Sequence, residues 1–157
     1  MHPHQALIER FYTAFQQKDY LTMQQCYHPD VRFSDPVFPK LKGAEAGLMW
    51  QMLLSRSQDF QMTFSNVEAN AQKGSCDWVA TYTFTSTRRL VKNVVHAEFL
   101  FKDGLISRHD DHFSFYEWAS QALGFTGKLL GWSRYLEEKI QTKAAEGLQK
   151  FIQQTNP

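Results

Sequence analysis

The sequence predicts an α+β domain in which helices pack on one face of a curved antiparallel sheet. Two observations support this prediction. Apolar residues recur at helical spacing in the N-terminal third of the chain, whereas from about residue 60 onward they alternate strictly with polar residues. A parallel sheet would instead require strands and helices to alternate along the chain. The order of helices followed by strands therefore favours an antiparallel meander.

The N-terminal part is predicted to form two helices. In the first, the apolar residues share one stripe, which consists of Leu7, Ile8, Phe11, Tyr12 and Phe15. Asp19 is suited to cap the N-terminus of the second helix. This helix should end near His28 and Pro29, because the residue before a proline avoids helical dihedral angles.

A short strand and a third helix are expected next. Val31, Phe33 and Asp35 share one face of the strand, so a carboxylate continues an apolar face, and Pro36 ends the pairing. After Gly43, the stretch from 44 to 56 predicts a helix. The residues expected on its packed side are Leu48, Met49, Met52 and Leu53.

Four strands complete the predicted sheet. Alternating patterns cover residues 60–64 and 78–85, and a third strand is expected over 94–102. Lys102, Asp103 and Gly104 predict a tight turn into a fourth strand from Leu105 to about Phe115. Residues 1–116 are thus expected to form one domain.

Residues 117–157 are predicted to form a helical C-terminal extension. Short helical pieces should bend at Gly124, Gly127 and Gly131. A longer helix follows, with an apolar stripe that consists of Leu136, Ile140, Ala144, Leu148 and Ile152. We expect the extension to pack on the same domain or on a dimer partner. The segment from Trp118 to Trp132 should close a pocket mouth or extend a dimer interface, since its large apolar residues would otherwise be exposed.

Composition argues against several classes of partner. The 157 residues carry 17 Lys and Arg against 16 Asp and Glu, so no strong field attracts nucleic acid. No membrane partner is expected either, because Glu137, Glu138 and Glu146 offset the basic residues of the tail helix. The sequence contains neither an export signal nor a long apolar span, and Cys26 and Cys76 do not form a disulfide framework. These features predict a cytoplasmic protein.

The last predicted strand carries the most informative polar residues. Strict alternation places Leu105, His109, Asp111, Phe113 and Phe115 on its apolar face. If this face points inward, His109 and Asp111 share an interior with Asp35. A carboxylate in apolar surroundings gains a raised pKa, which suits a general acid or base near neutrality.

Other interpretations of these three residues are open. His109 and Asp111 can simply orient each other by a hydrogen bond, and Asp35 can cap the turn before Pro36. Histidine and carboxylates are also metal ligands, but the spacing matches no recognised metal motif, so no metal and no cofactor are expected.

The front and end of residues 5–116 resemble the nuclear transport factor 2-like superfamily, which includes SnoaL-like polyketide cyclases, ketosteroid isomerase and limonene epoxide hydrolase. The matching segments are IERFYTAFQQKDY, YHPDVRFSDPVF and DGLISRHDDHFSF. The resemblance implies a cone-shaped sheet wrapped around a helix and a deep apolar pocket, usually in a homodimer. The segment QALGFTGKLLGW resembles a C-terminal extension found in one bacterial branch of this superfamily.

The same resemblance implies roles for individual residues. Asp35 occupies the position of the general base in ketosteroid isomerases, and Asp111 that of an essential acid in the SnoaL-like cyclases. Phe11 and Ala97 replace the oxyanion donors of the isomerases, and Thr81-Tyr82-Thr83 replaces the Arg-x-Asp of the epoxide hydrolases. A SnoaL-like arrangement is therefore expected, with Asp35, His109 and Asp111 as catalytic residues. The residues expected to bind substrate are Phe11, Tyr12, Phe33, Trp50, Tyr82, Ala97, Phe99 and Phe113.

Two functions follow as alternatives. The first is acid/base catalysis of an isomerase, cyclase or dehydratase type on a small hydrophobic carbonyl compound. The second is a non-catalytic module that binds an apolar ligand or a protein partner. The absence of the oxyanion donors favours the second, whereas the inward-facing acids favour the first.

Overall fold

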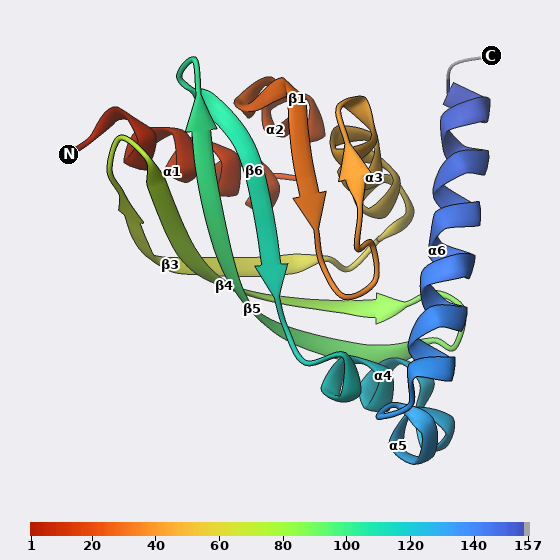
Figure 1. Cartoon of the computed structure of the whole chain (residues 1–157). Coiled ribbons are helices and arrows are strands. Elements are labelled where there is room, and N and C mark those ends of the chain that lie inside the picture. The colour runs from red at the N-terminus through yellow and green to blue at the C-terminus, as the bar shows by residue number, and fades with distance from the viewer. Residues whose placement is uncertain (156–157) are drawn as a thin grey trace.

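The computed structural model describes residues 1–155 and has the predicted α+β architecture. Its elements, in chain order, are α1 (Pro3–Gln16), α2 (Tyr20–Cys26), β1 (Tyr27–Ser34), β2 (Leu41–Lys42), α3 (Ala44–Arg56), β3 (Gln61–Ala69), β4 (Lys73–Phe84), β5 (Arg89–Lys102), β6 (Leu105–His112), α4 (Phe115–Leu123), α5 (Phe125–Leu130) and α6 (Arg134–Thr155). Figure 1 shows α1, α2 and α3 on the concave side of a strongly curved sheet.

The sheet has the strand order β2-β1-β6-β5-β4-β3. Strands β3 to β6 form the expected antiparallel meander, and β1 joins the sheet by pairing in parallel with β6. The turn between β5 and β6 is tight, because Asp103 and Gly104 both have positive φ angles, of 55° and 75°. The parallel pairing brings the end of β1 beside the end of β6, and thus the segment around Asp35 beside that around Asp111.

The first two helices match the sequence pattern. Ile8, Phe11, Tyr12 and Phe15 are buried along α1, which packs across β3 and β4. Asp19 caps α2, as its carboxylate accepts a hydrogen bond of 3.1 Å from the backbone N–H of Thr22. The helix ends at Cys26, and the following residues already belong to β1.

The phase predicted for α3 is only partly correct. Met49 and Met52 are buried, but Leu53 is 42% exposed, whereas Trp50 and Leu54 are buried. The reason is that α3 is covered on several sides, by α2, by β1 and by α6. A helix packed between several neighbours does not follow a single apolar stripe.

The pattern in β6 is interrupted by a β-bulge. Leu100 of β5 lies opposite Arg108, but its neighbour Phe101 lies opposite Ile106, so Ser107 is the extra residue. Consequently Ile106, and not Leu105 as predicted, points into the core. His109 and Asp111 follow the bulge and keep the predicted inward orientation. The strands also differ in length from the prediction: β6 ends at His112, and β5 begins at Arg89.

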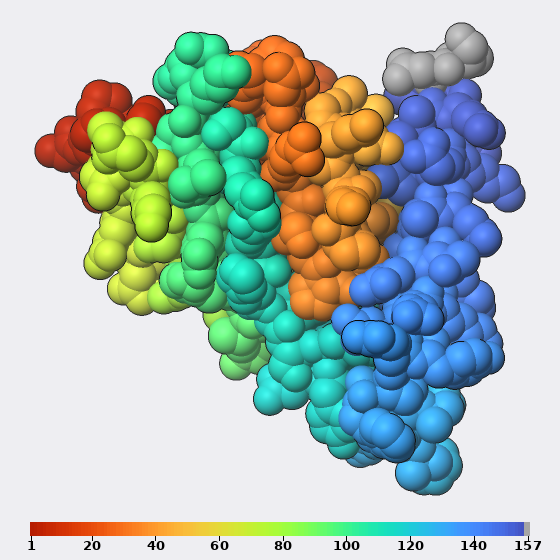
Figure 2. All heavy atoms as spheres, viewed as in Figure 1, coloured from red at the N-terminus to blue at the C-terminus, as the bar shows by residue number. Residues whose placement is uncertain are grey.

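The C-terminal extension packs along one side of the domain. Figure 2 shows α6, in blue, lying against the segment that contains α3. Leu148 of α6 is 1% exposed and belongs to the same apolar core as α1. Helix α4 packs on β5, and Gly124, with a φ of 65°, separates α4 from α5. No helix within residues 1–155 combines the length and the apolar character needed to cross a membrane.

Gly127 holds α5 close to α4, and this contact leads to a prediction. A Cβ atom at Gly127 would overlap the backbone carbonyl of Ala119, which cannot move without distorting α4. We expect Gly127→Ala to lower the free energy of unfolding by about 1–3 kcal/mol in urea titrations. Gly147→Ala is the matched control: its Cβ would meet no atom within 4 Å, so it should stabilise α6 by about 0.5–1 kcal/mol. Equal effects of the two substitutions would contradict this account.

Candidate functional site

A cavity of about 420 Å³ lies between the concave face of the sheet, α3 and the C-terminal extension. Its wall is mostly apolar and aromatic. The sheet and α3 contribute Trp50, Trp78 and Tyr82, and the loop before β3 contributes Phe60. Helices α4 and α6 contribute Trp118, Leu123, Ile140 and Ala144. The extension thus forms part of the pocket itself. Two carboxylates, those of Asp35 and Asp111, interrupt the apolar lining, and Arg56 and Lys143 are its only cations among the described residues.

Asp111 is the most unusual group on this wall. Its side chain is 1% exposed, yet the residue lines the cavity from the inner face of β6. The Oδ1 atom accepts two hydrogen bonds, from Nε2 of His109 at 2.8 Å and from Nε1 of Trp78 at 3.4 Å. Oδ2 has no partner among residues 1–155. A buried carboxylate oxygen without a partner is costly, and such groups concentrate at functional sites.

A chain of hydrogen bonds extends behind Asp111. Trp50 donates from Nε1 to the hydroxyl of Tyr27 at 2.8 Å, and this hydroxyl is 2.8 Å from Nδ1 of His109. Burial raises the pKa of the Tyr27 hydroxyl well above its ordinary value, so the hydroxyl stays protonated and donates a hydrogen bond to Nδ1. Nε2 of His109 then carries a proton and donates to Asp111. We call this arrangement the Trp50–Asp111 chain.

The direction of the Trp50–Asp111 chain follows from counting protons. The neutral imidazole satisfies every donor and acceptor from Nε1 of Trp50 to Oδ1 of Asp111. An imidazolium would direct a second N–H at the Tyr27 hydroxyl, which already accepts from Trp50, and would leave the hydroxyl proton without an acceptor. His109 is therefore held as the tautomer that donates to Asp111. It is 0% exposed and lies behind the cavity wall, so it orients Asp111 rather than facing a ligand.

Asp35 reaches the cavity from the turn that follows β1. Its Oδ1 accepts hydrogen bonds from the backbone N–H groups of Val37, at 2.7 Å, and Phe38, at 2.6 Å. Burial raises the pKa of the Asp35 carboxyl to about 7; the hydrogen bond from Phe38 opposes this shift, and the negative charge of Asp111 adds to it. The residue caps a turn, as the structural interpretation expected, and it also faces the cavity.

The other residues expected to bind substrate fall into two groups. Trp50, Tyr82 and Phe113 line the cavity. The remaining five are buried in the core and are not among the residues that line this cavity; they are Phe11, Tyr12, Phe33, Ala97 and Phe99. Phe33 and Phe99 instead enclose the His109 ring, at centroid distances of 5.0 and 4.6 Å. Alternation along a strand indicates that a side chain points inward, but it does not indicate how deep a cavity extends.

Removal of one hydroxyl tests the Trp50–Asp111 chain. Tyr27→Phe leaves the Trp50 N–H without its acceptor and Nδ1 of His109 without its donor, in a region shielded from water. We expect a loss of about 1–2 kcal/mol in the free energy of unfolding, measured in urea. Tyr135→Phe is the control, because Tyr135 is 71% exposed, and its effect should be close to zero. An undisturbed stability of Tyr27→Phe would show that the chain is not formed.

The described residues contain no group of three or more His, Cys, Asp or Glu side chains placed to hold a metal ion. Asp35, His109 and Asp111 do not converge on one point, because Nε2 of His109 is directed at Asp111. The arrangement is instead suited to proton transfer. Asp111, one oxygen of which has no partner among residues 1–155, lines an apolar cavity, and a second carboxyl that lines it, that of Asp35, has a pKa of about 7.

Comparison with protein families agrees with this geometry. A family model described as a SnoaL-like domain matches residues 8–109, which include α1 from Ile8 onward, α2, α3 and the sheet up to His109. The chain belongs to the SnoaL-like family. No curated protein matches this SnoaL-like chain. The match to the family model ends at His109, two residues before Asp111.

Solved structures share the fold of this SnoaL-like protein. TsrD from Streptomyces laurentii is 21% identical, with a TM-score of 0.64 and coverage of 78% of this chain and 95% of that chain. An LEH-like epoxide hydrolase from M. tuberculosis is 18% identical, with a TM-score of 0.63 and coverage of 80% and 92%. A candidate polyketide cyclase from Silicibacter sp. TM1040 is 20% identical, with a TM-score of 0.63 and coverage of 74% and 92%. Likeness at these identities shows the fold alone.

Proposed function

We propose that this SnoaL-like protein is a cofactor-independent acid/base catalyst of the isomerase, cyclase or dehydratase type, acting on a small hydrophobic carbonyl compound. The observation that carries the proposal is the buried carboxylate of Asp111, which lines an apolar cavity and whose Oδ2 atom has no partner within the described chain. An apolar wall favours a hydrophobic substrate. The SnoaL-like family and the resemblance in fold to a candidate polyketide cyclase support the reaction class.

In the proposed reaction the two carboxyl groups have different roles. Asp111 is the base: Oδ2 takes a proton from the carbon next to the carbonyl group, and the electron pair of the C–H bond moves to form an enolate. Asp35 is the acid: its pKa of about 7 keeps much of it protonated near neutrality, so it donates a proton to the developing oxyanion. His109 is a positioning residue, because it contacts Asp111 and lies behind the wall.

The alternative function is a binding module for an apolar ligand or a protein partner. The observation that favours it is the position of the hydroxyl groups of Tyr12 and Tyr27. Both residues are buried in the core and neither lies on the cavity wall, so neither is placed to bind an oxyanion. In this case the apolar lining binds the ligand, and the two acids have no chemical role.

One assay separates the two functions. A panel of hydrophobic ketones and β-keto compounds is incubated with the protein in D₂O, and deuterium uptake next to the carbonyl is followed by NMR. The catalytic proposal expects the exchange of at least one compound to be accelerated, with a rate proportional to protein concentration. Compounds that bind in the cavity without any accelerated exchange would contradict catalysis and support the binding module.

Assembly and location complete the proposal. We propose a homodimer that pairs through the outer face of the sheet, as the family resemblance implies, and a cytoplasmic protein. Val94 is 62% exposed on this face, beside the hydrogen-bonded pair of His96 and Asp77, at 2.6 Å. An apolar residue among polar groups supports an interface there.

A further inference from the structure

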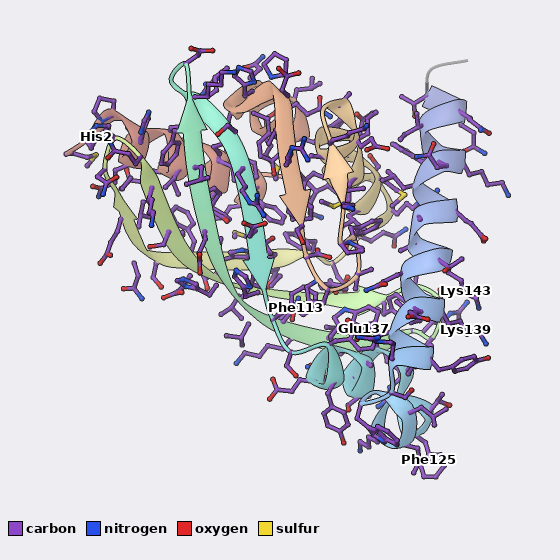
Figure 3. All side chains as sticks on the ribbon, viewed as in Figure 1. His2, Phe113, Phe125, Glu137, Lys139 and Lys143 are labelled. Carbon is purple, nitrogen blue, oxygen red and sulfur yellow. The ribbon has the colours of Figure 1, made fainter. Side chains whose placement is uncertain are left out.

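The C-terminal extension carries an exposed apolar surface at one end of the molecule. We call it the α5 tip. Its exposed fractions range from 42% to 76%, and its members are Phe125, Leu129, Leu130, Trp132 and Tyr135. Figure 3 shows Phe125 at the end of the molecule, pointing away from the rest of the protein. The structure thus leaves five large apolar side chains of the chain exposed, while Trp118 and Leu123 of the same segment line the cavity.

Positive charges predominate on the segment that carries the α5 tip, and the acidic residues Glu137 and Glu138 follow it in α6. Between Glu117 and Glu137 the chain contains Lys128 and Arg134 and no acidic residue. Arg88, in the turn between β4 and β5, and Arg89, the first residue of β5, add two more cations. Nε of Arg89 donates to the backbone carbonyl of Gln121 in α4 at 2.8 Å. None of the four cations forms an ion pair within residues 1–155.

We propose that the α5 tip docks this protein on the surface of an anionic lipid bilayer. Tryptophan, phenylalanine and leucine side chains insert at the boundary between headgroups and acyl chains, while lysine and arginine beside them contact the anionic headgroups. The α5 tip combines both features, and it protrudes from the end of the molecule (Figure 1), which suits shallow insertion.

A second copy of this chain fits the α5 tip less well. In a two-fold dimer the same surface faces itself, so the four cations of each copy would lie opposite those of the other. Like charges brought together across an interface weaken association. A negatively charged bilayer offers the opposite charge together with an apolar layer. The charge distribution therefore favours lipid over self-association.

The α5 tip also continues into the cavity wall. Leu123, at the end of α4, lines the cavity and precedes the exposed Phe125 by two residues. Phe84, Thr85 and Ser86, from the segment that leads to Arg88 and Arg89, line the same cavity. A lipophilic molecule leaving a bilayer at the α5 tip would reach the cavity along apolar side chains. The proposal is independent of whether the cavity catalyses a reaction or only binds a ligand.

A bilayer partner at the α5 tip departs from the sequence-based expectation of no membrane partner. That expectation rested on the glutamates of the tail helix. In the structure, Glu137 lies in the first turn of α6, and Glu138 and Glu146 are exposed along that helix, whereas the apolar residues of the α5 tip lie between Phe125 and Tyr135. Only the arrangement of α4, α5 and the β4–β5 turn brings the four cations around one apolar surface.

The test is co-sedimentation of the whole chain with vesicles of phosphatidylcholine alone and of equal parts phosphatidylcholine and phosphatidylglycerol. Trp132 is 76% exposed, whereas Trp50 and the other two tryptophans are buried, so a blue shift of the fluorescence on binding reports Trp132. We expect binding to the anionic vesicles, with a blue shift, and weaker binding as salt is added. Lack of binding to the anionic vesicles would overturn the proposal.

Variants distinguish binding through the α5 tip from non-specific binding of the protein to vesicles. Phe125→Ser should lower the partition coefficient about tenfold, and Lys128→Ser about fivefold. The matched controls are Leu21→Ser, since Leu21 is 61% exposed on α2, and Lys150→Ser on α6; both should bind as the wild type does. Far-UV circular dichroism verifies the fold of each variant. If Phe125→Ser leaves vesicle binding unchanged but alters the mass measured by light scattering, the α5 tip is a protein interface and the proposal is wrong.

Discussion

Replacement of Asp111 by asparagine is expected to lower the rate of proton exchange about 10²–10⁴-fold, the usual contribution of one positioned proton-transfer group. The amide oxygen can still accept the hydrogen bonds from His109 and Trp78, so the local structure should persist. The amide nitrogen would then take the place of Oδ2, and it cannot accept a proton from carbon. NMR measurement of deuterium uptake in D₂O gives the rate.

A matched control lies next to Asp111 on the opposite face of β6. Asp110 is partly exposed and pairs with Arg108 at 2.8 Å, outside the cavity. Asp110→Asn should leave the exchange rate within about twofold of the wild type, since a surface ion pair contributes little. Ligand affinity, measured by calorimetry, should change little in either variant. Unaltered exchange in Asp111→Asn would remove Asp111 from the mechanism and leave the binding module as the better description.

Local sequence patterns predicted the parts of the site that depend on local geometry. Alternation along the last strand placed His109 and Asp111 on the inner face, where both are buried. The same rule failed at Leu105 and Ile106, because the bulge at Ser107 shifts the phase by one residue. A bulge depends on how two strands pair, and the sequence of one strand carries no clear signal of it.

The parts that the sequence did not predict depend on contacts between distant segments. Periodicity correctly identified an apolar stripe on the tail helix, but not the surface that it covers. Ile140 and Ala144 of that stripe line the cavity, about a hundred residues after Asp35. Likewise, alternation along the strands predicted that Phe33 and Phe99 point inward. Their position behind the cavity wall depends on their packing against His109, which sequence alternation does not show.

A second prediction concerns Asp35 and the dependence of the free energy of unfolding on pH. Burial raises its pKa in the folded protein from 3.8 to about 7. Below pH 3.8 the carboxyl is protonated in both states and has no effect. Between pH 3.8 and 7 the unfolded chain loses the proton while the folded chain keeps it, so the free energy of unfolding falls as the pH rises. Above about pH 7 the carboxyl is ionised in both states, so the decrease in the free energy of unfolding is complete and no longer depends on pH.

Asparagine at position 35 removes this decrease in the free energy of unfolding. Its side-chain oxygen can accept the hydrogen bonds from Val37 and Phe38, and it carries no charge. We expect Asp35→Asn to match the wild type near pH 4 and to exceed it by about 3 kcal/mol at pH 8, less than the full linkage value because the carboxyl is partly exposed. Urea unfolding across this pH range provides the measurement.

Asp59→Asn is a control of opposite sign. Hydrogen bonds from Thr83 lower the pKa of the Asp59 carboxyl, so its charge stabilises the folded state above its unfolded pKa, and this stabilisation is lost as the pH falls through the lowered value. Its replacement should therefore not stabilise the protein at pH 8. A gain for Asp35→Asn that is the same at pH 4 and pH 8 would show that the Asp35 carboxyl does not keep its proton in the folded state. In that case the proposed acid would lack its proton near neutrality. A gain in the free energy of unfolding that is confined to high pH, together with loss of proton-exchange activity in Asp35→Asn, supports Asp35 as the acid.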